Sequence, residues 1–95
     1  MLRTLKANSR TGSFEIRIAG EVQGVGFRPF VYKTARDLDL EGWVSNTSSG
    51  VLIRVKAHPD KVTTFIKNLR TLLPLHASIS SIASQTIPDQ SFRGF

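Results

Sequence analysis

The fold of this chain is decided by the sequence VQGVGFRPF, residues 22–30. Before it, FEIRI (residues 14–18) alternates apolar and charged residues, a pattern typical of a half-buried strand. After it, Pro29 suits the first turn of a helix, where its missing N–H is not needed. Residues 22–28 are therefore predicted to form a glycine-bearing loop that leaves a strand, ends on Arg28 and runs into a helix N-terminus.

Such a loop has the chemistry of a site for a phosphate-like anion. Gly24 and Gly26 let the backbone turn tightly and bring several N–H groups close to a ligand. These groups, the positive helix end and the Arg28 guanidinium would point at one small volume. The same residues also fit an ordinary strand-to-helix turn with a solvated arginine. The established phosphate motifs do not match, because G-x-x-x-x-G-K-[ST] is absent and Pro29 replaces the third glycine of G-x-G-x-x-G.

Composition limits the other classes of site. The 95 residues are enough for one domain, and they contain no cysteine and two histidines, which excludes thiolate chemistry and disulfides and makes a metal cluster implausible. Half of the net charge of +6 comes from Arg3, Lys6 and Arg10, so residues 1–12 are expected to be a loosely held or disordered tail before a domain at 13–95. No signal peptide or membrane-length apolar run appears, which predicts a soluble cytoplasmic protein.

The remaining pattern predicts the order strand, helix, strand, strand, helix, strand. The first helix is expected to run from Pro29 to a stop at Gly42, followed by a hairpin of 43–47 and 51–57 with Trp43 in the core. A second helix opens at His58-Pro59-Asp60, with Asp60 as N-cap, and ends at Pro74. Residues 79–86 form a weak strand, and 92–95 begin another. This order predicts an α+β, ferredoxin-like sandwich, βαββαβ, with two helices on one face of an antiparallel sheet.

Two motifs together resemble the acylphosphatase family: VQGVGFR at 22–28 and GWVSN at 42–46, within a similarity that extends over roughly residues 14–82. The resemblance implies that Arg28 binds the phosphoryl oxygens, and that Asn46 holds the attacking water. It also implies a cradle of backbone N–H groups and no metal or other cofactor. The cradle residues would be Gln23, Gly24, Val25, Gly26 and Phe27. From its type and place alone, Asn46 equally fits a turn at the end of a strand.

Two further segments, FRPFVY at 27–32 and LPLHA at 73–77, resemble the N-terminal acylphosphatase-like domain of the hydrogenase-maturation carbamoyltransferase. This implies carbamoyl phosphate as substrate, and we expect these residues to be the N-terminal piece of that longer enzyme, with its further domains as partners. The alternatives are a free-standing acylphosphatase, and an anion-binding or docking module without turnover.

Other partners are expected to be few. Inorganic phosphate or sulfate would bind in place of the acyl phosphate, and the protein is expected to be a monomer that binds neither nucleic acid nor membrane. An RNA-recognition domain would share the strand order. Its signature of aromatic residues at the centre of the sheet is absent from GVLIRV, residues 50–55.

Overall fold

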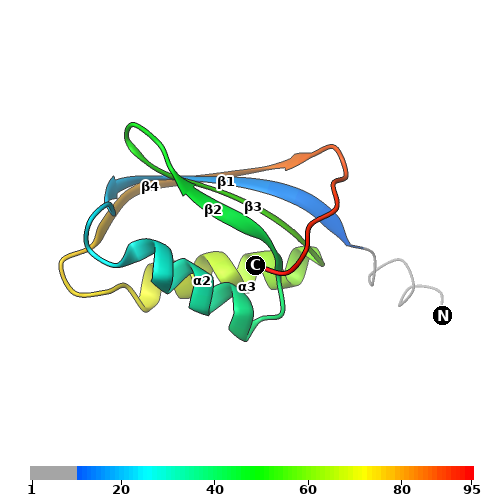
Figure 1. Ribbon diagram of the computed structural model, residues 1–95, viewed down its shortest axis with the longest axis horizontal. Coiled ribbons are helices and arrows are strands. Elements are labelled where there is room, and N and C mark those ends of the chain that lie inside the picture. The colour runs from blue at the N-terminus through cyan, green and yellow to red at the C-terminus, as the bar shows by residue number, and fades with distance from the viewer. Residues whose placement is uncertain (1–10) are drawn as a thin grey trace.

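The computed structural model describes residues 11–95, which form a sandwich of one sheet and two helices (Figure 1). The elements are β1 (Gly12–Glu21), α2 (Phe27–Asp37), β2 (Glu41–Asn46), β3 (Gly50–Ala57), α3 (Pro59–Thr71) and β4 (Ser78–Ile87). The sheet is antiparallel in the order β2-β3-β1-β4, and both helices lie along one face of it. The expected βαββαβ, ferredoxin-like fold is thus confirmed. No helix among these residues is long and apolar enough to cross a membrane.

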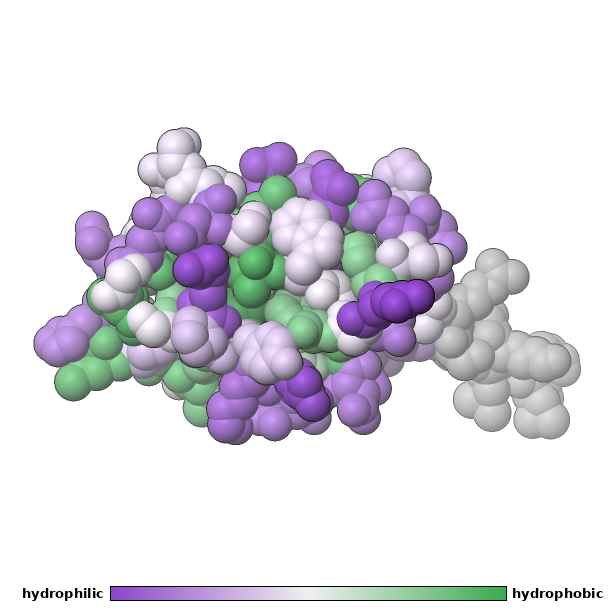
Figure 2. Space-filling model, in the orientation of Figure 1, coloured by the Kyte–Doolittle hydropathy of each residue, from purple (hydrophilic) through white to green (hydrophobic). Residues whose placement is uncertain are grey.

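The core lies between the sheet and the helices. Ile16 and Ile53, which are partners across β1 and β3, are fully buried, as is Phe65 on α3. Each such side chain contributes about 1.5–3 kcal/mol through the area it removes from water. Figure 2 shows the hydrophobic residues of this face mainly in a band between the sheet and the helices, with hydrophilic residues on both sides of it. Ile16 and Ile18 are buried, so the half-buried strand expected at residues 14–18 is confirmed.

The opposite face of the sheet carries a row of polar partners. Trp43, Arg54, Glu15 and Gln85 stand opposite one another across β2, β3, β1 and β4. Arg54 Nη2 lies 2.9 Å from Glu15 Oε2, and Gln85 Nε2 donates to Glu15 Oε1 at 3.2 Å. Arg17 adds an ion pair at 3.3 Å. These side chains cover Glu15 so well that it is buried on the face without helices.

The same neighbours set the charge state of Glu15 and the position of Trp43. The hydrogen bond from Arg54 holds the pKa of the Glu15 carboxyl below its ordinary value, against the opposing effect of burial. The nearby charge of Arg17 acts in the same direction. The Arg54 guanidinium lies 5.8 Å from the centre of the Trp43 ring. The expectation that Trp43 belongs to the core is wrong, because Trp43 is 38% exposed on the helix-free face.

The first helix begins and ends earlier than expected. It starts at Phe27, so Pro29 is its third residue. It ends at Asp37 because Asp39 adopts a left-handed conformation, with φ of 57°. The N–H groups of Asp39 and Leu40 then bond to the carbonyls of Arg36 and Ala35, the pattern of a Schellman motif. Gly42, the expected stop, lies inside β2 instead.

The ends of α3 and of the described chain also differ from expectation. His58, and not Asp60, is the N-cap, and its Nδ1 accepts from the Asp60 N–H at 3.1 Å. Residues 92–95 form no strand. They cross back so that Gly94 O accepts from Gly42 N at 2.9 Å and the Phe95 ring contacts Tyr32. Of the expected tail at 1–12, residues 1–10 lie outside the described residues, and Gly12 already belongs to β1.

Candidate active site

Apolar side chains at every second or third position fix the loop between β1 and α2 to the core. Val22 and Phe27 are each 1% exposed, and Val25 packs partly against the same core. The residues between them, Gln23, Gly24 and Gly26, are exposed, and so is Arg28. The apolar residues therefore hold the backbone in place while the glycines and the arginine face solvent.

Gly24 and Gly26 have the conformations that make glycine necessary here. Their φ values are 74° and 80°, in the left-handed region. A Cβ atom added at either position would meet no atom within 4 Å. The requirement for glycine is therefore conformational and does not arise from crowding. The open space beside both residues leaves the loop backbone accessible to a ligand.

The N-terminus of α2 has the electrostatics of an anion site. Gly26 is the N-cap and has no side chain to accept the orphan N–H groups, and the first turn contains no acidic residue. The N–H groups of Phe27 and Arg28 have no partner within the helix by its geometry, while Pro29 has no N–H to satisfy. Phe30 N, the next donor, bonds to Gly26 O at 3.2 Å. Two donors and the positive helix end are thus directed outward at the loop.

Arg28 lies in this same first turn. Within residues 11–95 no carboxylate forms an ion pair with its guanidinium. The opposite is true of Lys33, further along α2, which pairs with Asp37 at 2.9 Å. Arg28 thus brings five N–H donors in a planar fork to the helix turn that carries the orphan backbone donors. A phosphoryl group is the kind of ligand that matches such a set.

Asn46 ends β2 at the same end of the sheet. It stands opposite Val51, and Val44 stands opposite the buried Ile53. Because side chains alternate along a strand, Asn46 belongs to the face that carries the helices, as Val44 does. This places it on the same side of the sheet as the start of α2. No hydrogen bond of the Asn46 side chain is found within residues 11–95.

The sequence analysis did not predict one contact at this end of the sheet. The side-chain amide of Gln23 donates to the carbonyl of Thr47 and, at 2.9 Å, to the carbonyl of Gly50. It thereby joins the loop to the β2–β3 turn that follows Asn46. The sequence interpretation assigned Gln23 only a backbone N–H. The glutamine in VQGVGFR was a signal that a side-chain donor lies in the loop, but its partners are distant in sequence.

Among the described residues 11–95, no side chain at the site is suited to general base catalysis. His58 caps α3 at the opposite end of the sheet. His76 lies nearer, in the connection that leads to β4, and it is exposed with φ of 74°. Glu21, the last residue of β1, is also exposed. Among residues 11–95, no group of three or more histidine and acidic side chains is arranged to hold a metal ion.

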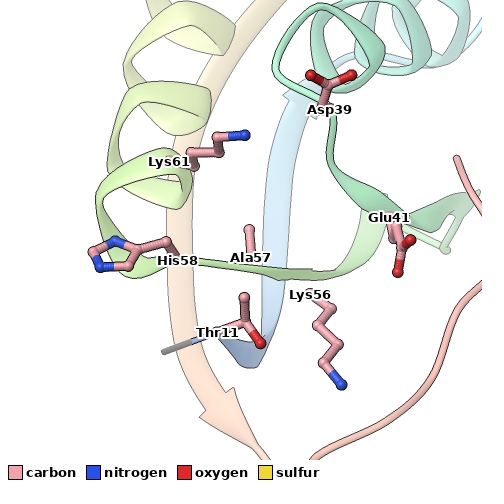
Figure 3. A pocket seen from close by; sticks show the side chains of 7 residues that line it. All are labelled: Thr11, Asp39, Glu41, Lys56, Ala57, His58 and Lys61. Atoms are coloured by element: carbon pink, nitrogen blue, oxygen red, sulfur yellow. The ribbon is translucent and has the colours of Figure 1, made fainter. Parts of the chain in front are cut away.

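A hollow of about 340 Å³ lies at the other end of the sheet. Figure 3 shows its charged lining, which includes Lys56, Lys61, Asp39 and Glu41. In that view the side chains diverge, with His58 directed away from Glu41 and Lys56. Mixed charges that do not converge on one point do not form a binding site of defined chemistry. The loop at 22–28 remains the candidate.

Two kinds of known protein are similar to this chain. Residues 14–95 match the sequence model of the acylphosphatase family. The chain is 39% identical over 80 residues to a carbamoyltransferase HypF of Synechocystis, which covers 84% of this chain and 10% of that protein. It is 35% identical over 81 residues to an acylphosphatase of Pseudothermotoga lettingae, covering 84% of this chain and 90% of that protein. It thus spans about a tenth of the one relative and most of the other.

Solved structures of both kinds are similar to this chain as well. Full-length HypF in its phosphate- and nucleotide-bound form is similar with a TM-score of 0.84 and 33% identity, over 88% of this chain and 11% of that chain. An acylphosphatase from Coxiella burnetii is similar with a TM-score of 0.83 and 28% identity, over 95% and 93% of the two chains. Fold and sequence agree over nearly all of the described residues. The chain belongs to the acylphosphatase family.

Proposed function

We propose that the loop at 22–28 and the start of α2 bind the phosphoryl group of an acyl phosphate, and that the domain hydrolyses it. One observation carries the proposal. The N-terminus of α2 has no side-chain cap and no acid in its first turn, and it has Arg28 beside it. A dianionic ligand is the complement of that arrangement.

An acyl phosphate is a mixed anhydride and is already activated. Its hydrolysis requires a cradle for the phosphoryl oxygens and a correctly placed water, but no strong nucleophile. In this proposal the Arg28 fork and the backbone N–H groups of residues 23–27 hold the phosphoryl oxygens. The Asn46 amide, which donates and accepts hydrogen bonds, holds the water. An oxygen of the substrate's own phosphate takes the proton, which agrees with the scarcity of bases near the loop.

We further propose carbamoyl phosphate as the acyl phosphate. The support is the similarity to proteins named carbamoyltransferase, at 39% and 42% identity in Synechocystis and Cupriavidus necator. In this proposal the residues act as the acylphosphatase-like domain of such an enzyme in hydrogenase maturation, in the cytoplasm. A general acylphosphatase is the second candidate, favoured by the 90% coverage of the Pseudothermotoga lettingae protein.

Arg28→Lys tests the binding role. Lysine keeps the charge but lacks the planar fork, so it should not replace arginine. Losing two charge-assisted hydrogen bonds of about 1.5–3 kcal/mol each weakens phosphate binding by about a hundred-fold or more. Calorimetric titration with phosphate measures the affinity. Release of phosphate from carbamoyl phosphate and benzoyl phosphate measures turnover and substrate preference.

Arg36→Lys is the matched control. Arg36 is an exposed arginine of the same helix, where it donates to the Tyr32 hydroxyl at 2.8 Å, away from the loop. Its replacement should leave phosphate affinity unchanged. Equal phosphate affinity in Arg28→Lys and the parent would refute the bidentate role. Phosphate binding without release of phosphate from either substrate would indicate a binding module without turnover.

Asn46→Ala separates the chemical step from binding. It should lower kcat strongly, while inhibition by inorganic phosphate changes little, because the amide acts on the water and not on the phosphoryl group. Steady-state kinetics with phosphate as inhibitor provides both quantities. A loss confined to phosphate affinity would assign Asn46 to the cradle instead.

A further inference from the structure

We propose that the side chain of Gln23 is a positioning residue, which sets the distance between the phosphate loop and Asn46. This inference rests on the proposed function. The backbone of Gln23 belongs to the loop, but its side chain does not face a ligand there. It reaches across to the β2–β3 turn, where both of its contacts lie.

The geometry requires an amide at this position. Both acceptors are carbonyl oxygens, of Thr47 and Gly50, so only the NH₂ end of the side chain can bond to them. An uncharged group with two hydrogens in a fixed fork satisfies both carbonyls at once. Asparagine has the same group on a side chain shorter by one carbon. Glutamate has the length but no donor.

The two carbonyls lie on the two sides of the turn. Thr47 directly follows Asn46, and Gly50 begins β3. Thr47 N also donates to Gly50 O at 2.9 Å, so the turn is closed at its base. A bond from Gln23 to each side therefore fixes the turn as a unit relative to the loop. Asn46 is the residue immediately before that unit.

Gly50 in turn is held against β1. A Cβ atom at this position would lie 1.8 Å from Ile18 O, so the backbones of β3 and β1 approach closely there. Thr47 has no such support, since it lies outside the paired strands. Within residues 11–95, no other hydrogen bond joins residues 22–28 to residues 47–50. The hydrogen bonds of the Gln23 amide therefore fix the position of the loop relative to the turn that directly follows Asn46.

The test uses Gln23→Met, which retains length and approximate volume but has no donor. With benzoyl phosphate, kcat should fall about ten- to a hundred-fold, the range expected when a water-holding group is displaced slightly. Inhibition by inorganic phosphate should change less than about two-fold, because the cradle itself is intact. Gln90→Met is the matched control, since Gln90 lies in the segment after β4, outside the loop and the turn. It should leave kcat unchanged.

A double-mutant cycle distinguishes positioning from a general structural role. If Gln23 acts through Asn46, Gln23→Met should lower kcat less than about two-fold further in an Asn46→Ala background. Losses that multiply would overturn the inference, and so would a proportional loss of phosphate affinity. A second measurement does not depend on turnover. Exchange of the Thr47 amide hydrogen, followed by NMR, should be faster in Gln23→Met than in the parent.

The two proposals can therefore fail separately. Absence of phosphate release from the parent protein would refute the proposed hydrolysis and leave the exchange measurement to decide the role of Gln23. Unchanged exchange at Thr47 in Gln23→Met would refute the link itself, whatever the kinetics.

Discussion

Replacing Phe65 by alanine tests the architecture as a whole. Phe65 is fully buried on α3, where it faces the sheet. A Phe→Ala change at such a position removes transfer free energy and leaves a cavity, at a cost of about 3–5 kcal/mol. Domains of this size have a total stability of about 5–15 kcal/mol. The loss caused by Phe65→Ala is therefore a large fraction of the free energy of unfolding. At about 4–8 °C per kcal/mol, Tm should fall by roughly 12–40 °C.

Leu72→Ala provides the comparison, because Leu72 follows the same helix but is 61% exposed. It should change stability by no more than about 0.5 kcal/mol. Urea titrations of both variants, followed by far-ultraviolet circular dichroism, give the free energies of unfolding, and an unchanged slope shows that the same surface is exposed. A loss below about 1 kcal/mol for Phe65→Ala, or equal losses for the two variants, would refute the position of Phe65 in the core.

Two further predictions concern the sheet and the loop. Because the pKa of Glu15 is lowered in the folded state, its contribution to stability is present above its ordinary value of 4.5 and is lost as the pH falls through the folded value. Urea midpoints measured from pH 7 downward should therefore fall less steeply in acid for Glu15→Gln than for the parent, and parallel curves would contradict this. Gly26→Ala should cost about 1–2 kcal/mol for its left-handed φ alone. Gly50→Ala should cost more because of the 1.8 Å approach to Ile18 O, and equal urea midpoints for the two variants would be inconsistent with the crowding.

The order of the elements and the inward faces of the strands could be predicted because their signals are local. Ile16 and Ile18 lie on either side of the charged Arg17, and Ile53 and Val55 alternate with the charged Arg54 and Lys56 on β3. Trp43 shows where a general rule misled. The prediction of a core position followed the general preference of aromatic side chains for the core. Alternation with the half-buried Val44 gives the correct outward face.

The remaining differences arise from contacts between distant segments. The helix begins at Phe27 because Gly26 before it is left-handed. The preference of proline for the first turn had predicted a start at Pro29 instead. The candidate site could be proposed from the glycines and the arginine of the loop. The contact of Gln23 with the β2–β3 turn could not be predicted. Its partners are 24 and 27 residues away, and they are backbone carbonyls, which every residue type provides. The position of Phe95 against Tyr32 depends on the tertiary fold in the same way.

The anchoring of the loop by Val22, Val25 and Phe27 has a thermodynamic consequence for ligands. Ordering the backbone of one residue costs about 1–2 kcal/mol in conformational entropy. Here that cost belongs to folding, since the same apolar residues that close the core also immobilise the loop. An anion that binds to the exposed side of the loop therefore finds its donors already in position, and its affinity is not reduced by the ordering of five or six residues. If the loop binds phosphate as proposed, core mutations near Val22 or Phe27 should weaken that binding through entropy, even though both side chains are buried.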